Sequence, residues 1–110
     1  MRTFLLSALI LTSASLIICR PLAAASDPKA GQGVYEKHCS TCHGPNGAAP
    51  PNVAYFQSGR ITDLRSEKVQ SRSDAEIAKI VNSGAGKMRG DATVSGQAMT
   101  DLVAYLRVMK

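Results

Sequence analysis

The sequence predicts an all-α domain, because helix-start signals and helical apolar spacing recur along the chain whereas strand alternation does not. Asp27-Pro28 places an N-cap residue before proline, a combination typical of the first turn of a helix. Ser73-Asp74-Ala75-Glu76 has the form of a capping box, in which serine and glutamate each accept a hydrogen bond from the other's backbone N–H. No segment shows convincing period-two alternation, and the sequence contains no internal repeat.

The first helix is expected to begin at Pro28 and to continue into the cysteine-containing stretch that follows. Gly31 and Gly33 lower its helix propensity, which suggests that the backbone is closely packed there. Glycines and prolines in residues 44–52 then break the helix into a loop. Residues 53–72 are weakly patterned, with one short helix expected near residues 62–69.

Two further helices are expected in the C-terminal half of the chain. The capping box opens a helix that ends at Gly84, and its apolar positions share one face: Ile77, Ile80 and Val81. Residues 84–91 are expected to form a glycine-broken loop that contains Met88. Ser95 is expected to cap the last helix. The buried stripe of that helix consists of Met99, Leu102, Val103 and Leu106.

Residues 1–25 have the features of a secretory signal peptide, which predicts export to the bacterial periplasm or its equivalent. Arg2 provides a positive start, residues 4–18 are mostly apolar, and Ala23-Ala24-Ala25 supplies a small-residue cleavage site. The apolar run is shorter than a typical membrane span, so retention as an uncleaved anchor is the less favoured alternative.

Cleavage after Ala25 would leave one domain, residues 26–110, with two cysteines. Lipidation of Cys19 is disfavoured, since Ile18 is not the small residue that such sites need. Removing the leader lowers the formal net charge from +5 to +3. This modest charge, without a basic run or interleaved aromatic residues, argues against nucleic-acid binding. A domain of 85 residues often needs a covalent staple or a cofactor.

Cys39-Ser40-Thr41-Cys42-His43 is the most informative stretch, because C-x-x-C-H is the pattern of covalent haem attachment. Residues three and four apart share one face of a helical turn. Cys39 and Cys42 can therefore each bond one haem vinyl group while His43 points toward the iron. A thioredoxin-like disulfide would need a βαβ setting that the chain does not offer. A zinc site would need two more ligands, and only His38 and His43 are available.

His43 is the expected proximal iron ligand, with its second ring N–H donated to a backbone carbonyl. Helix geometry places His38 about 140° away around the axis, as a surface residue. Met88 is the expected sixth ligand, because it alone of the four methionines lies in an irregular loop between helices. The other methionines fall in the leader, in the buried stripe and near the C-terminus, and they are Met1, Met99 and Met109.

Over nearly all of residues 28–110, the chain resembles the class I c-type cytochromes, the small monohaem cytochrome c family. Gly31 and Tyr35 precede the first motif cysteine by eight and four residues, as small and aromatic residues do in the family's first helix. Residues 101–106 resemble the family's last helix. The resemblance implies the cytochrome c fold, with three to four helices packed around one covalently bound haem. It also implies that Tyr35 and Tyr105 pack where the two helices cross closely at Gly31.

Residues 84–88 resemble the family's methionine-ligand loop, although Arg89 stands where members often have proline. The resemblance also implies that Pro51 supplies the carbonyl for the proximal histidine. The expected protein is thus an exported electron carrier with one haem c, whose iron is held by His43 and Met88. With both axial positions filled, no enzymatic activity and no substrate pocket are expected.

The expected partners are redox proteins, and a monomer is favoured. Lys37, Lys87 and Arg89 could form a positive rim that steers an acidic partner. One alternative is a dedicated electron-accepting subunit of a periplasmic dehydrogenase. Another is a gas- or small-ligand-binding haem protein, if Met88 does not ligate. A dihaem peroxidase is weaker still, since it needs a second attachment motif and the chain has one.

Overall fold

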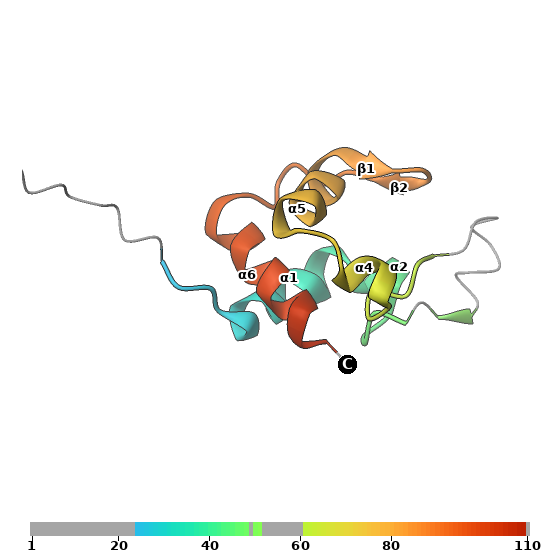
Figure 1. The fold of residues 1–110 in the computed structure, drawn as a ribbon, viewed down its shortest axis with the longest axis horizontal. Helices are drawn as coiled ribbons and strands as arrows, with labels where there is room; N and C mark the ends of the chain where they lie inside the picture. The colour runs from blue at the N-terminus through green and yellow to red at the C-terminus, as the bar shows by residue number, and fades with distance from the viewer. Residues whose placement is uncertain (1–23, 49, 52–60, 110) are drawn as a thin grey trace, which may run out of the picture.

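The computed structural model describes residues 24–48, 50–51 and 61–109 of the chain. These residues form the helices and strands labelled in Figure 1: α1 (Pro28–His38), α2 (Ser40–His43), α4 (Glu67–Gln70), α5 (Asp74–Ser83), β1 (Gly84–Ala85), β2 (Met88–Arg89) and α6 (Gly96–Val108). Most of the described elements are helices, as the sequence predicts. Cys19 and residues 1–23 of the expected signal peptide lie outside the described residues. Within the described ranges, no helix has the length and apolar character needed to span a bilayer.

Helix α1 begins at Pro28 as its sequence predicts, but it ends at His38, before the cysteine motif into which it was expected to continue. The Asp27 side chain accepts a hydrogen bond from the Lys29 backbone N–H at 2.9 Å, with Pro28 in the first turn. The helix closes at Cys39, whose N–H donates to the Tyr35 carbonyl at 2.8 Å. The single turn α2 follows immediately, so the cysteine motif forms a slightly broken continuation of α1.

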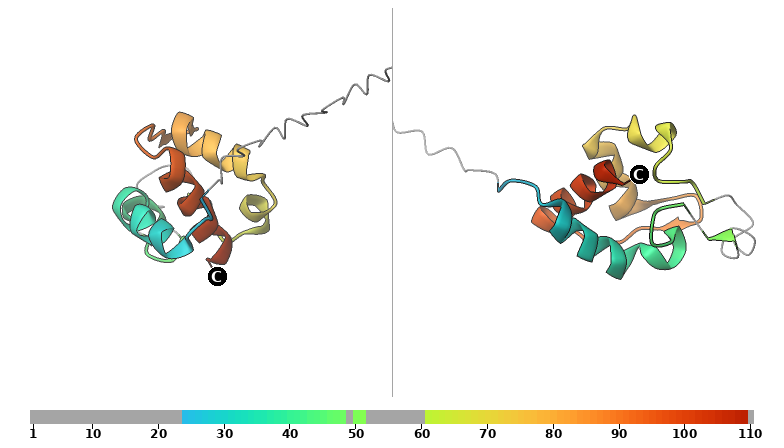
Figure 2. Two further views of the ribbon diagram at one scale, coloured as in Figure 1. Left: turned by 90° about the vertical axis from the view of Figure 1, so that its left-hand side faces the viewer. Right: turned by 90° about the horizontal axis from the view of Figure 1, so that it is seen from below.

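Helix α1 packs along α6, as the views in Figures 1 and 2 show. At Gly31 the two backbones approach so closely that a Cβ atom there would lie 1.9 Å from the Asp101 carbonyl oxygen. The Tyr35 and Tyr105 rings meet with their centroids 5.4 Å apart and their planes tilted by 54°. The predicted crossing is therefore confirmed at Gly31. The close packing expected at Gly33 is wrong, because nothing lies within 4 Å of a Cβ atom placed there.

The start of α1 is also fastened to α6 through a buried carboxylate. Asp101 is 7% exposed, and its Oδ1 accepts hydrogen bonds from the Asp27 backbone N–H and the Gln97 side-chain amide, both at 2.8 Å. Carboxylates accepting backbone N–H groups at a helix N-terminus are favoured by the helix dipole. Asp101 thus caps the first helix from the last one.

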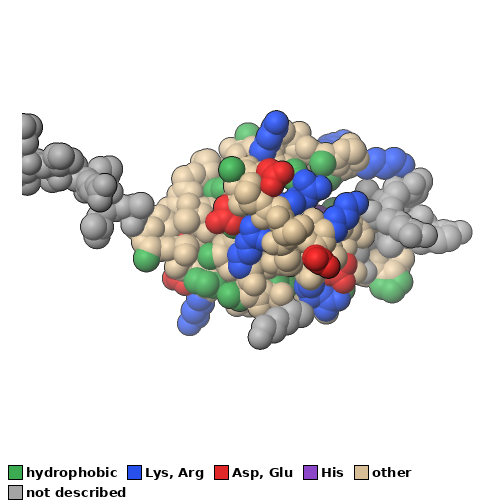
Figure 3. All heavy atoms as spheres, in the orientation of Figure 1, with side chains coloured by type: hydrophobic (Ala, Val, Ile, Leu, Met, Phe, Trp, Pro, Cys, Tyr) green, Lys and Arg blue, Asp and Glu red, His purple; other side chains and the backbone are tan. Residues whose placement is uncertain are grey.

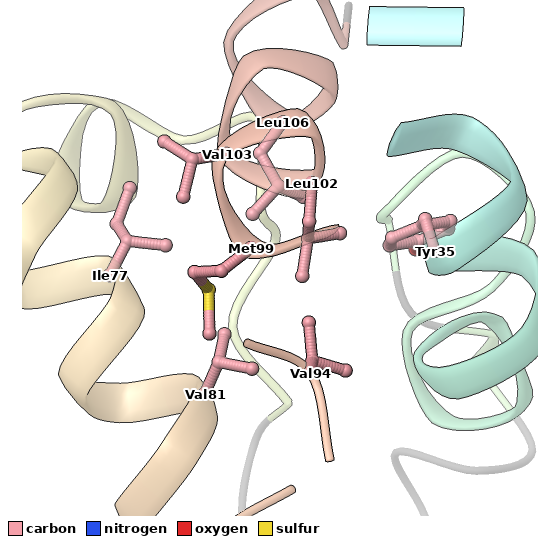
Figure 4. Close-up of a cluster of buried hydrophobic side chains, with 8 residues drawn as sticks. All are labelled: Tyr35, Ile77, Val81, Val94, Met99, Leu102, Val103 and Leu106. Carbon is pink, nitrogen blue, oxygen red and sulfur yellow. The ribbon is translucent and has the colours of Figure 1, made fainter. Parts of the chain in front are cut away.

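The core lies between α1, α5 and α6, and Figure 4 shows its eight side chains pointing toward one another. Its members are Tyr35, Ile77, Val81, Val94, Met99, Leu102, Val103 and Leu106. The stripe predicted for the last helix is buried as expected, and Met99 is a packing residue. The sequence indicated no packing role for Met109, which lies near the C-terminus. In the structure it is partly buried and packs against this core.

Several predicted helix boundaries can be compared with the structure. The Ser73 capping box forms in full at the start of α5, and Gly84 caps its end. The weak helix expected near residues 62–69 is a single turn, α4, displaced toward the C-terminus. Ser95 is the N-cap residue of α6, as predicted, but its side chain makes no capping hydrogen bond.

The loop expected at residues 84–91 contains a small antiparallel hairpin, which the absence of strand alternation had argued against. Gly84 pairs with Arg89 and Ala85 with Met88. Strands of two residues are too short to show a period-two pattern, which explains why the prediction was wrong. The sequence feature that could have predicted the hairpin is the two-residue connection that begins with glycine. Gly86 has φ 57° in the structure, as such a tight turn requires.

Candidate functional site

The predicted attachment motif forms one compact turn. The backbone N–H groups of Cys42 and His43 both donate to the Cys39 carbonyl, at 3.2 and 3.0 Å. Cys39 is half-buried, Cys42 is exposed, and both thiols are free. Burial, assisted by the charges of Asp91 and Cys42, raises the pKa of Cys39 to about 11. The two sulfur atoms therefore come from one turn, but from surroundings of unequal polarity.

His43 ends this turn with its ring partly buried. Its Nδ1 atom is shielded from solvent and has no hydrogen-bond partner among the described residues. Burial also lowers the pKa of the ring, which favours the neutral imidazole that can bind a metal. The expected hydrogen bond to the Pro51 carbonyl is not formed, so that prediction is wrong for this structure. A partnerless buried ring nitrogen is costly, and metal ligation or a carbonyl acceptor would remove that cost.

Tyr35 is hydrogen-bonded to the residue that follows the motif, a contact that the sequence did not predict. Its hydroxyl donates to the Gly44 carbonyl at 2.6 Å in a buried hydrogen bond, and Gly44 directly follows His43. The Tyr35 side chain is fully buried, and burial raises its pKa to about 12. The tyrosine of the helix crossing therefore also fixes the chain at the point where the motif ends.

Met88 lies on β2 and is 37% exposed, one of two large apolar side chains that are exposed among the described residues. The hairpin that carries it lies at the same end of the molecule as α2 (Figures 1 and 2). The other two methionines within the described ranges, Met99 and Met109, pack against the core. Met88 is thus the described methionine whose thioether remains available to a ligand.

His38 is a surface residue, as expected, and its side chain forms a hydrogen bond with a distant residue. Its Nδ1 lies 2.8 Å from Oδ2 of Asp91, which follows the hairpin. The link joins the last residue of α1 to a position 53 residues further along the chain. No local sequence pattern signals such a pair, which is why the sequence analysis missed it.

The two alternatives to haem gain no support from the described residues. In these parts of the chain, no three His, Cys, Asp or Glu side chains gather as a metal site, as structural zinc would need. The motif continues a helix rather than following a strand of a βαβ unit. Two thiols on one turn, an imidazole with an unpartnered nitrogen and an available thioether fit covalently bound haem instead.

Comparisons with known proteins agree with this chemistry. The family described as cytochrome c oxidase, cbb3-type, subunit III, matches residues 26–106. A solved structure of KustC0563, a c-type cytochrome, is similar with a TM-score of 0.58 and 24% identity, covering 73% of this chain and 96% of that one. No curated protein matches the chain. The family match spans most of the sequence and the fold agrees with it, so the chain belongs to this family and is a small, class I-like c-type cytochrome.

Proposed function

We propose that this protein is an exported monohaem cytochrome that carries single electrons between redox proteins. Membership of the family itself implies haem-based electron transfer rather than catalysis, with covalently bound haem c and its iron. The observation that carries the proposal is the Cys39–His43 turn, which continues α1 in a chain of that family. Residues 1–25 would be the signal peptide and residues 26–110 the functional domain.

Each proposed ligand has a separate role. Cys39 and Cys42 would hold the haem through two thioethers, and the neutral His43 imidazole would bind the iron from the α2 side. Met88 would present its thioether from the hairpin as the sixth ligand. When bound, haem supplies a one-electron couple, whose potential is raised by histidine/methionine ligation. Because two side chains, His43 and Met88, would hold the iron, it would offer no open position to a substrate, which supports a carrier over an enzyme.

The proposed partners are redox proteins that dock at the hairpin end, with the carrier itself a monomer in the periplasm. Lys37, Lys87 and Arg89 are exposed there or nearby. Figure 3 shows several separate Lys and Arg side chains on one face, with Asp and Glu among them. A moderately basic rim would raise the association rate with an acidic partner more than the affinity.

Two related functions remain as alternatives. A fixed electron-accepting subunit, such as one of a periplasmic dehydrogenase, would use the same chemistry and would co-purify with its partner. A small-ligand-binding haem protein is favoured by one observation, the exposure of Met88 on a two-stranded hairpin with Arg89 beside it. A weakly held sixth ligand could be displaced by an exogenous one.

The proposal is tested on protein exported from cells that mature c-type cytochromes. A pyridine haemochrome spectrum and an intact mass should report one haem, two thioethers and a chain that begins at Ser26. The oxidised protein should show the weak near-infrared charge-transfer band of methionine–iron ligation. Met88→Leu should abolish this band, whereas the matched Met109→Leu variant should keep it. A colourless product with two reactive thiols would disprove haem attachment, and a high-spin wild-type spectrum would disprove Met88 ligation.

A further inference from the structure

Asp91 follows the Met88 hairpin and holds its C-terminal end through hydrogen bonds to several parts of the chain. Its backbone N–H donates to the Val81 carbonyl of α5 at 2.7 Å. Its Oδ1 accepts from the Thr93 backbone N–H at 3.0 Å and from the Thr93 hydroxyl. With its amide oriented to satisfy both ends, Asn82 donates to the Asp91 carbonyl at 3.2 Å. Asp91 therefore links the end of the hairpin to α5 and to the residues that follow it.

The remaining carboxylate oxygen of Asp91 reaches a different part of the fold. It lies 2.8 Å from Nδ1 of His38, the last residue of α1, which directly precedes Cys39. The two side chains are only 24% and 35% exposed, so solvent screens the contact less than it would a fully exposed pair. Since His38 directly precedes Cys39, this hydrogen bond brings the Asp91 carboxylate to the start of the attachment turn.

The hairpin has little stability of its own. Two strands of two residues are marginal in water, and their geometry must come from what holds their ends. At the first end, the Gly84 N–H donates to the Ile80 carbonyl and so continues directly from α5. At the other end, the His38–Asp91 hydrogen bond crosses to the helix that leads into the attachment turn.

We propose that His38 and Asp91 form a clamp that positions Met88, by tying the end of its hairpin to the helix that carries the attachment cysteines. The clamp rests on the proposed ligation by Met88, and both of its members are positioning residues. It would hold the hairpin at a fixed position relative to the attachment turn, in a chain where Arg89 replaces the proline common in the family. Breaking it should allow the hairpin to open more often and an exogenous ligand to replace the thioether more easily.

The test compares wild type, His38→Ala and Asp74→Asn as oxidised holoproteins. Asp74 makes an ion pair of similar length with Arg107, at 2.7 Å, and lies at the opposite end of α5 from the hairpin. Imidazole is titrated while the near-infrared methionine–iron band is followed. Hydrogen exchange of the backbone amides of residues 84–90 is measured separately, because it reports hairpin opening whether or not Met88 binds iron.

His38→Ala should bind imidazole roughly two- to fivefold more tightly than wild type, the range expected for the loss of one partly exposed side-chain hydrogen bond. Its hairpin amides should exchange faster, and Asp74→Asn should change neither quantity. Unchanged affinity and exchange in His38→Ala would overturn the clamp, as would equal changes in both variants. If wild type lacks the band, ligation by Met88 is wrong, and the exchange measurement still supports or overturns the clamp.

Discussion

Replacing Gly31 by alanine tests the packing of the first helix on the last, on which the rest of the fold depends. The new Cβ would lie 1.9 Å from the Asp101 carbonyl oxygen and 2.4 Å from its carbon, whereas real contacts are essentially never below 3.0 Å. The helices must therefore separate by about 1.1 Å. Both atoms belong to backbone, so no side-chain rotation can relieve the overlap.

The expected cost follows from opposing contributions. Overpacking of this severity costs about 3 kcal/mol, and the better helix propensity of alanine returns about 1 kcal/mol. The net loss of about 2 kcal/mol should lower Tm by roughly 8–16 °C in a domain of this size.

Gly33 in the same helix supplies a matched control, since a Cβ atom there meets nothing within 4 Å. Gly33→Ala should stabilise the protein by about 1 kcal/mol through propensity alone. Urea unfolding of the holoproteins, followed by far-UV circular dichroism, would measure both effects. A Gly31→Ala variant as stable as wild type would refute the packing argument, and so would equal losses in the two variants.

The remaining predictions concern two buried polar groups and the docking surface. Tyr35→Phe removes the donor to Gly44 and should cost about 1 kcal/mol by urea unfolding. Because burial raises the pKa of Tyr35 to about 12 in the folded state from the ordinary 10.0, wild type should lose stability as pH rises through that interval, and the phenylalanine variant should lack this loss. Asp101→Asn replaces the charged acceptor of the Asp27 N–H and should also cost about 1 kcal/mol in unfolding free energy, with the haem spectrum unchanged. Stopped-flow electron transfer to an acidic partner should slow as ionic strength rises, and a flat response would rule out the positive rim.

The helices were predictable where their signals are local. Asp27 and Ser73 act as caps through residues two or three positions away, and the stripe beginning at Met99 is visible in a window of one helix. Gly33 shows the limit of such reasoning, because low propensity does not reveal whether another backbone is nearby. Ser95 occupies the predicted N-cap position without a side-chain hydrogen bond, since residue type alone does not fix the direction of a hydroxyl.

The candidate site divides in the same way. The attachment turn occupies five consecutive residues, so its geometry follows from helix periodicity alone. Two features could not be predicted, because they depend on how distant segments are brought together. These are the lack of a hydrogen-bond partner for Nδ1 of His43 and the His38–Asp91 hydrogen bond. Ligation by Met88 remains a prediction, because its exposure shows that the thioether is available and not what it binds.

The crossing of α1 and α6 also constrains when this protein can fold. Helix α1 packs mainly on α6, so its buried face, which includes Tyr35, is not covered until α6 has formed. Contacts between such distant segments form late, because a long loop must close before they are gained. The Cys39–His43 turn directly follows α1, so its two sulfur atoms remain on an unpacked stretch of chain until this crossing has formed.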